Sequence, residues 1–267
     1  TELNVNSSGI IEPKNLISAI RPETVLISII SANNETGNIQ PIDELVKISR
    51  YKNIPFHTDL VQSFCKMDFD LSKCAADYAT ATAHKIGGPR GIGILYVKEG
   101  APFHSLITGG KQERIRRAGT ENVLLAVGFS KAVEWYLSKQ TELRKKFFKF
   151  RDKILDEIKK FDEIFINTDL KNSLPNTLNF GFHGISAESI LISLDLDGVA
   201  ISTGSACSSG AMEASPVLLA MGLSRADAKS SLRISCGWTT TENEVDYFCE
   251  RLKFHILRMR EKRTSFF

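Results

Sequence analysis

Short strand-like runs alternate with helical spacing over residues 1–100, and this alternation constrains the fold more than any other feature. Residues 25–31 (VLISIIS) form a β-branched run typical of a buried strand, and residues 41–51 carry apolar side chains at helical spacing. Further strands are predicted at 54–59, 78–82 and 93–97. Strands and helices that alternate at these lengths predict an α/β fold of three layers with a largely parallel sheet.

The second half of the chain has a different character. Residues 121–138 and 141–161 are predicted to form two long helices. Shorter elements follow, namely a strand at 176–181, a helix at 186–194, a Gly/Ser-rich loop at 202–210, a strand at 231–235 and a last helix that Thr240 or Thr241 caps, with Glu244 in its first turn. The change predicts two domains, residues 1–120 and a smaller α+β domain at 121–267.

The composition is that of an ordinary globular protein, with 42% hydrophobic and 24% charged residues. A net charge of +3 is too small to indicate nucleic acid as a partner. Five cysteines without a CxxC pair argue against a disulfide framework or a metal site, and for a reducing compartment. No apolar run approaches the roughly 20 residues that span a bilayer, so no membrane association is predicted. The N-terminus carries no signal or transit peptide.

Residues 80–91 (TATAHKIGGPRG) set Lys85 between a predicted strand and a glycine-rich turn. Strand ends are where α/β folds place their ligand crevices. A partly desolvated amine at such a point suits Schiff-base chemistry with a carbonyl cofactor. A surface lysine before a turn is the alternative interpretation.

Asp59 stands at the end of the predicted strand 54–59, in the sequence His57-Thr-Asp-Leu-Val-Gln62. A carboxylate there can pair with a pyridinium nitrogen and keep it protonated. The alternative is that Asp59 caps a following helix.

Two more residues are unusual for their surroundings. Cys207 lies among small residues (TGSACSSG, 203–210), which indicates an accessible and reactive thiol rather than a buried one. Arg233 lies inside a short, partly apolar strand, where it requires an anionic partner such as a carboxylate or phosphate. An internal ion pair is the competing interpretation for Arg233.

Taken in order, these features resemble the class V aminotransferase family, and more narrowly its NifS/IscS-type cysteine desulfurases. The matching segments are 33–37 (NNETG), 57–62 (HTDLVQ), 83–91 (AHKIGGPRG), 112–114 (QER) with 117–122 (RAGTEN), and 204–209 (GSACSS). The resemblance implies a fold type I, pyridoxal phosphate-dependent transferase. Residues 1–120 would be the C-terminal part of its large domain, and 121–267 the interdomain helix and small domain with a mobile cysteine loop.

The resemblance also implies a role for each residue. Lys85 would bind pyridoxal 5'-phosphate covalently, exchange it for substrate cysteine and remove the Cα proton. The remaining cofactor contacts would come from Asp59 at the pyridine nitrogen, Gln62 and Asn34 at the phenolic oxygen, Thr82 and His84 at the phosphate, and Thr120 across a dimer interface. Arg233, with Asn34 beside it, would bind the substrate carboxylate. Cys207 would take the substrate sulfur as a persulfide and leave alanine.

The resemblance further implies L-cysteine as substrate, a sulfur-acceptor or iron–sulfur scaffold protein as partner, and a homodimer. The compartment would be the cytoplasm, or the mitochondrial matrix in a eukaryote. Family members have a further segment before the part that Thr1–Gly9 resembles, with a phosphate-binding turn and a ring-stacking histidine. None of His57, His84, His104, His183 and His255 matches that histidine, so the chain is expected to correspond to the family's C-terminal two thirds.

Two alternatives for the function remain open at this point. Selenocysteine lyase is a close relative that uses a lysine and a cysteine in the same way. A non-catalytic remnant could instead serve as a binding module in sulfur-transfer assembly.

Overall fold

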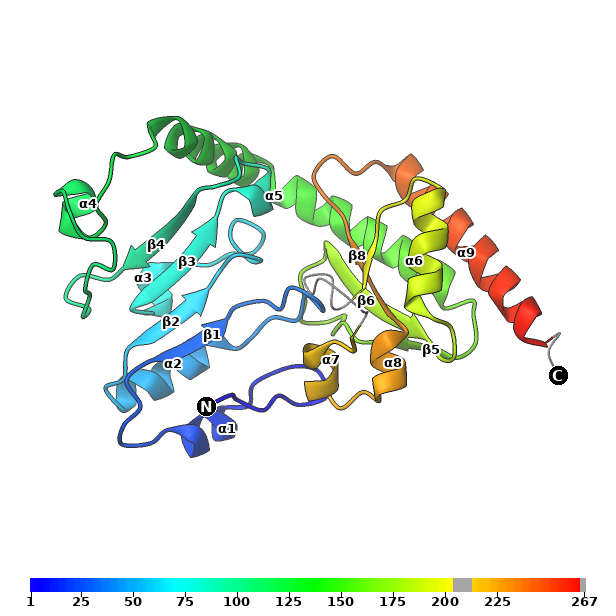
Figure 1. Cartoon of the computed structure of the whole chain (residues 1–267), viewed down its shortest axis with the longest axis horizontal. Coiled ribbons are helices and arrows are strands. Elements are labelled where there is room, and N and C mark those ends of the chain that lie inside the picture. The colour runs from blue at the N-terminus through cyan, green and yellow to red at the C-terminus, as the bar shows by residue number, and fades with distance from the viewer. Residues whose placement is uncertain (204–212, 265–267) are drawn as a thin grey trace. The chain divides into compact units, whose positions relative to one another are not determined.

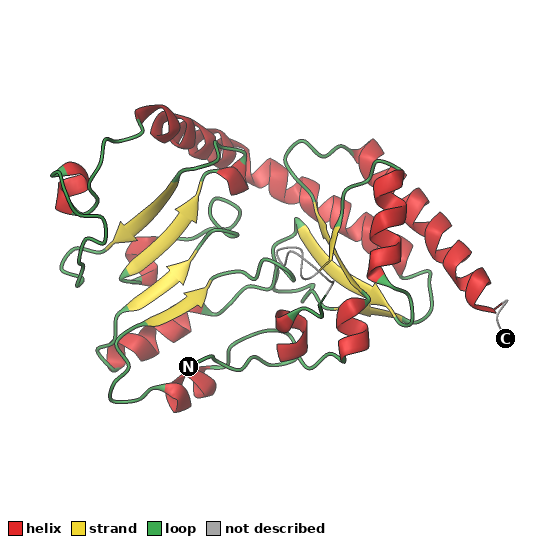
Figure 2. Cartoon of the chain, viewed as in Figure 1, coloured by secondary structure: helices red, strands yellow, loops and turns green. Residues whose placement is uncertain are grey.

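The computed structural model describes residues 1–203 and 213–264, with side chains described as far as Glu261 (Figure 1). The chain forms two compact units. We call Leu16–Ser31 with Pro41–Gln140 the α/β unit, and Thr1–Asn15 with Ala32–Gln40 and Thr141–Phe267 the α+β unit. Figure 2 shows that each unit contains one sheet flanked by helices.

The sheet of the α/β unit has the strand order β1-β2-β3-β4. Its strands are β1 (Ile27–Ile30), β2 (Phe56–Asp59), β3 (Tyr78–Thr82) and β4 (Gly93–Val97). The first three run parallel and β4 runs antiparallel to β3. The connection from β3 to β4 is too short for a parallel crossover, which requires about a dozen residues or more. The four predicted strands are confirmed, although β1 and β2 are shorter than predicted.

Helices and turns fill the rest of the α/β unit. They are α1 (Pro13–Ala19), α2 (Ile42–Tyr51), α3 (Leu71–Cys74), the 3-10 helix η1 (His84–Ile86), α4 (Gln112–Ile115) and the first part of α5 (Val123–Ile158). The first three residues of α1 are assigned to the α+β unit. The apolar stripe of α2 is buried through Ile42, Leu45 and Val46, as the predicted helical spacing requires. On the sheet, burial alternates along β2 and β3, so one face is buried and the other is half-exposed.

The sheet of the α+β unit is antiparallel throughout, with the order β5-β6-β8-β7. Its strands are β5 (Ile164–Ile166), β6 (Thr177–Phe182), β7 (Ser202–Thr203) and β8 (Ser231–Ser235), and its helices are α6 (Ala187–Leu196), α7 (Pro216–Ala220), α8 (Arg225–Lys229), α9 (Glu242–Thr264) and the second part of α5. Phe180, Phe182 and Ile190 are fully buried in its core with residues of α5 and α9. Ser202 and Thr203, predicted as loop, pair with β8 instead.

The prediction of two long helices at 121–138 and 141–161 is wrong in one respect, because the single helix α5 continues through the expected break. The residues at the expected break, Lys139 and Gln140, are good helix formers, and no Gly or Pro lies between Phe129 and Ile158. The two compact units divide this helix between residues 140 and 141. The domain boundary at residue 120 stays a prediction.

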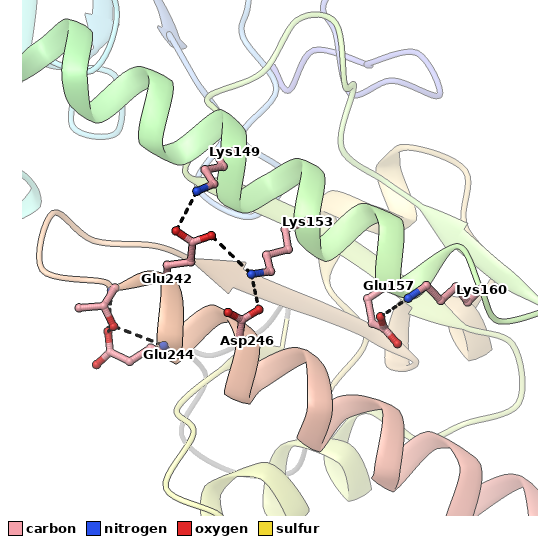
Figure 3. Close-up of polar contacts among 8 residues, drawn as sticks. Lys149, Lys153, Glu157, Lys160, Glu242, Glu244 and Asp246 are labelled. Atoms are coloured by element: carbon pink, nitrogen blue, oxygen red, sulfur yellow. Dashed lines mark hydrogen bonds and ion pairs between the residues drawn. The ribbon is translucent and has the colours of Figure 1, made fainter.

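The start of α9 is held by a cap and by ion pairs to α5 (Figure 3). Thr241 Oγ1 accepts a hydrogen bond from Glu244 N, and Glu244 Oε2 accepts one from Thr241 N at 2.7 Å, which confirms the predicted cap. Lys149 Nζ lies 2.7 Å from Glu242 Oε2, and Lys153 pairs with Asp246. Each exposed pair contributes little, about 0–1 kcal/mol, so the network mainly fixes the register of α9 on α5.

Buried hydrogen bonds fasten residues 32–40 within the α+β unit. The Asn38 side chain, with no exposed surface, donates to Ser8 O (2.8 Å) and accepts from Asp169 N (2.8 Å). Asn179 of β6 is equally buried, and its Nδ2 donates to Glu35 O (3.2 Å) while its Oδ1 accepts from Asn167 Nδ2 (2.7 Å). Because buried amides must form hydrogen bonds, these contacts hold residues 32–40 in one conformation.

We predict that Asn179→Ala lowers the free energy of unfolding by about 2–3 kcal/mol, because the backbone carbonyl of Glu35 and the amide of Asn167 each lose a buried partner. Denaturation followed by circular dichroism measures the change. Asn4→Ala, at an exposed position, is the control and should alter stability by no more than about 0.5 kcal/mol. Equal stability of the two variants would contradict this account of the turn.

Candidate functional site

The carboxyl ends of the parallel strands bring several of the predicted site residues to one edge of the α/β unit. Asp59 is the last residue of β2, and Thr82 is the last residue of β3. The hydrogen bond from Leu60 N to Thr80 O, at 2.8 Å, joins the chain just after β2 to β3. Thr82 Oγ1 lies 2.9 Å from His84 Nδ1 in η1, and Lys85 is the next residue. This edge is where ligands bind in open α/β sheets. The roles inferred for these residues stay predictions.

The turn after β3 exposes Lys85 while burying its neighbour Ile86. Gly87 follows with a φ of +81°, which favours glycine. A Cβ on Gly88 would lie 2.9 Å from Ala83 Cβ and 3.0 Å from Ala132 Cβ. The chain therefore packs too closely here for any larger residue, and this packing fixes the short helix that presents the lysine.

Asp59 does not cap a helix, because the residues that follow it form turns. Its Oδ1 accepts a hydrogen bond of 2.7 Å from Val61 N. Gln62 lies half-buried in the same turn. The helix-cap interpretation is wrong, and one carboxylate oxygen of Asp59 makes no hydrogen bond with the part of the chain that the structure describes.

Positive charges gather near Lys85. Burial lowers the pKa of the Lys66 ammonium to about 8, and the charge of Lys85 acts in the same direction. The pKa of the His84 imidazole is also lowered, first by burial and then by the charges of Lys85 and Arg90. Neither Lys66 nor Lys85 has an acidic side chain within 4 Å among residues 1–203 and 213–261. An anion bound here would relieve the repulsion.

Sequence reasoning missed Lys66. Lys66 lies in the turn after Asp59, where Leu60, Ser63 and Cys65 are buried, and no local sequence signal marks it. A lysine inside such a stretch is desolvated together with its neighbours.

A second group of site residues lies in the α+β unit. Arg233 of β8 donates through Nη1 to Asn34 O at 3.1 Å. Its Nε is buried and has no hydrogen-bond partner among the residues described. No acidic group of the described chain lies within 4 Å of the guanidinium, so the internal ion pair proposed as its competing interpretation is not formed there. Arg233 therefore keeps donors for a ligand.

Glu35 also belongs to this group and was missed as well. Its side chain is buried, and its Oε2 accepts a hydrogen bond of 2.6 Å from Ser215 Oγ, the N-cap of α7. Burial raises the pKa of Glu35, while the Ser215 hydrogen bond and the charge of Arg233 oppose the rise. A polar turn such as Asn33-Asn-Glu-Thr-Gly37 gives no hint in sequence that its glutamate is buried.

Two predicted site residues remain to be placed. Cys207 lies in 204–212, outside the described residues. Thr120 is exposed on the segment between α4 and α5. In the described part of the chain, no three His, Cys, Asp or Glu side chains are grouped as a metal ion requires, and no helix combines the length and apolar character needed to cross a membrane.

We predict that Lys85→Met raises the pKa of Lys66 above about 8, because removal of a nearby positive charge favours the protonated amine. An NMR titration of ¹³C-methylated lysines measures this value. Lys47→Met, on the exposed face of α2, is the control and should leave the titration of Lys66 unchanged. An unchanged pKa of Lys66 in Lys85→Met would contradict an electrostatic interaction between the two amines.

Comparisons with known proteins agree with the resemblance seen in the sequence. The aminotransferase class V family model matches residues 1–248. The cysteine desulfurase IscS of Dictyoglomus turgidum is 40% identical over 261 residues, which cover 97% of this chain and 66% of that protein. IscS of Methanosarcina thermophila is 39% identical over 260 residues, with 97% and 64% covered. The chain thus spans just under two thirds of the length of these relatives.

Solved structures give the same result. A NifS-like protein superposes with a TM-score of 0.88 at 37% identity, covering 97% of this chain and 68% of that one. A NifS-like protein from Rickettsia africae gives 0.86 at 32% identity, with 95% and 69% covered. SspA in complex with cysteine gives 0.73 at 35% identity, with 88% and 65% covered. The predicted NifS/IscS-type resemblance is confirmed, and the chain belongs to the class V aminotransferase family.

Proposed function

We propose that this protein is a pyridoxal phosphate-dependent cysteine desulfurase, which converts L-cysteine to L-alanine and an enzyme-bound persulfide. The observation that carries the proposal is the set of groups at the carboxyl edge of the α/β sheet. There Lys85 is exposed among other cations, Thr82 and His84 offer polar atoms, and Asp59 keeps a carboxylate oxygen without a hydrogen bond to the described residues. The names of the relatives, IscS and NifS-like, support the same activity.

These residues fit the cofactor in their chemistry. A phosphate group requires cations and hydroxyl or imidazole donors, which Lys66, Thr82 and His84 supply. A protonated ring nitrogen requires a carboxylate, which Asp59 supplies. Bound pyridoxal phosphate would act as an electron sink for the bonds at the substrate Cα. Gln62 and Asn34 are proposed to contact its phenolic oxygen.

The residues of the chain divide the remaining work. The Lys85 amine binds the cofactor covalently and later removes the proton from the substrate Cα. Arg233 binds the substrate carboxylate through the guanidinium donors that Asn34 O does not use. Fixing the carboxylate orients the substrate, so that the bond to be broken has the alignment that the reaction requires.

Cys207 accepts the sulfur. Its thiolate attacks the substrate sulfur and an S–S bond forms, while the Cβ–S bond breaks and its electron pair stays with the carbon fragment. That fragment takes up a proton on the way to L-alanine. Cysteine and an enzyme thiol thereby become alanine and an enzyme persulfide, and the step needs no external oxidant or reductant.

The persulfide would pass to an acceptor, either an iron–sulfur scaffold or another sulfur-transfer protein. We propose a homodimer, in which exposed Thr120 reaches the phosphate bound by the other copy. No observation favours selenocysteine lyase or a non-catalytic binding module over the desulfurase, and the names of the relatives favour the desulfurase.

We predict that protein incubated with pyridoxal phosphate gains a visible absorption band, and that Lys85→Ala abolishes it, because the covalent attachment is lost. Absorption spectroscopy after removal of free cofactor measures the band. Lys47→Ala, which changes an exposed lysine of α2, should keep it. A wild-type protein that stays colourless would contradict the proposed function.

We predict that Cys207→Ala retains the visible band but releases at least about 100-fold less sulfide from L-cysteine, since the nucleophile is missing. Sulfide release in the presence of a reductant measures the loss. Cys249→Ala changes a buried thiol of α9 and should keep most of the activity. Normal turnover by Cys207→Ala would remove the thiol from the mechanism.

A further inference from the structure

Glu35 is a buried carboxylate that stands near a cation without touching it. Its side chain is 7% exposed, and its Oε2 accepts a hydrogen bond of 2.6 Å from Ser215 Oγ. No ion pair within 4 Å joins it to Arg233 in the described chain, although the Arg233 charge is close enough to favour its ionised form. A buried charge is costly unless another charge compensates it. Arg233 and Glu35 therefore compensate one another at a distance.

The arrangement leaves Arg233 with guanidinium donors that have no partner among the described residues. A direct ion pair would occupy them in a bidentate contact. Here Ser215 holds the carboxylate, Asn34 O takes Nη1, and Nε stays buried without a partner among the described residues. The pair thus has a net charge of zero but keeps hydrogen-bonding capacity for an anion.

The backbone around Glu35 keeps its charge in place. Asn179 Nδ2 donates to Glu35 O at 3.2 Å, and Asn33 Oδ1 accepts from Glu35 N at 2.8 Å. Ser215 Oγ accepts a hydrogen bond from Leu218 N as the cap of α7. The carboxylate cannot swing toward the guanidinium without breaking contacts that belong to the core, so it acts on Arg233 through its field alone.

We propose that Glu35 is a specificity-determining residue, which restricts the Arg233 site to amino acids that carry one carboxylate and no further negative charge. The positive charge of Arg233 can compensate one carboxylate of the ligand. A second negative charge on the ligand has no such compensation and is repelled by the Glu35 carboxylate. The inference rests on the proposed function in one respect, namely that Arg233 binds the substrate carboxylate.

Chemical protection of Arg233 tests this inference without cofactor or turnover. Phenylglyoxal modifies free guanidinium groups, and peptide mass spectrometry follows the reaction at Arg233. L-Serine and L-aspartate are the protecting ligands, since they are similar in size, lack a thiol and differ by one negative charge. The measured quantity is the ratio of their half-protecting concentrations, aspartate over serine.

We predict that the ratio is well above one in the wild-type protein and falls about tenfold in Glu35→Gln, which removes the charge but keeps an acceptor for Ser215. Glu35→Asp, which retains the charge, should keep a high ratio and shows that the position tolerates change.

An unchanged ratio in Glu35→Gln, or an equal fall in Glu35→Asp, would overturn the inference. Failure of both amino acids to protect wild-type Arg233 would overturn it together with the substrate-binding role of Arg233. A colourless protein whose Arg233 is still protected selectively would instead leave the inference standing and contradict the proposed cofactor chemistry, so the two failures are distinguishable.

Discussion

The α+β unit depends on a set of buried amide hydrogen bonds around Asn38 and Asn179. Both side chains are without exposed surface, and their partners lie far away in sequence, at Ser8, Asn167 and the backbone of Glu35. An amide buried without partners would destabilise the fold by several kcal/mol, so the turn at residues 32–40 has little freedom. That rigidity matters because the same turn supplies the carbonyl that orients Arg233. The core, rather than the surface, therefore positions the guanidinium.

The α/β unit positions its lysine by different means. Parallel strands bring Asp59 and Thr82 to one edge, and the close approach of Gly88 to Ala83 fixes the turn that carries Lys85. Among the described residues, the α+β unit leaves the Nε of Arg233 without a partner, and the α/β unit holds the mutually repelling amines of Lys66 and Lys85. Such groups lower stability, and local conflicts of this kind are expected where a protein binds something.

Much of the fold could be predicted from the sequence, because strands such as 78–82 combine alternation with clear turn signals. The single helix α5 was not predicted, although Lys139 and Gln140 at the expected break are good helix formers. Among the site residues, Lys85, Asp59 and Arg233 stood out because their types are unusual at strand positions. Lys66 and Glu35 did not, because charged residues in turns are ordinarily solvated and only the tertiary structure buries them. Burial of charge is a long-range property that a local pattern does not contain.

The two clusters differ in net charge, and therefore in the ligand that each can accept. Lys66 and Lys85 form a positive pair without an acidic side chain within 4 Å among the residues described, which suits a phosphate of more than one negative charge. Arg233 already has the compensating charge of Glu35, so an additional anion there must bring little excess charge of its own. A zwitterionic amino acid meets that condition because its ammonium group balances its carboxylate. In the proposed function, the field at each cluster would thus direct phosphate to the lysines and the amino acid to the arginine, before any contact between ligand and protein is formed.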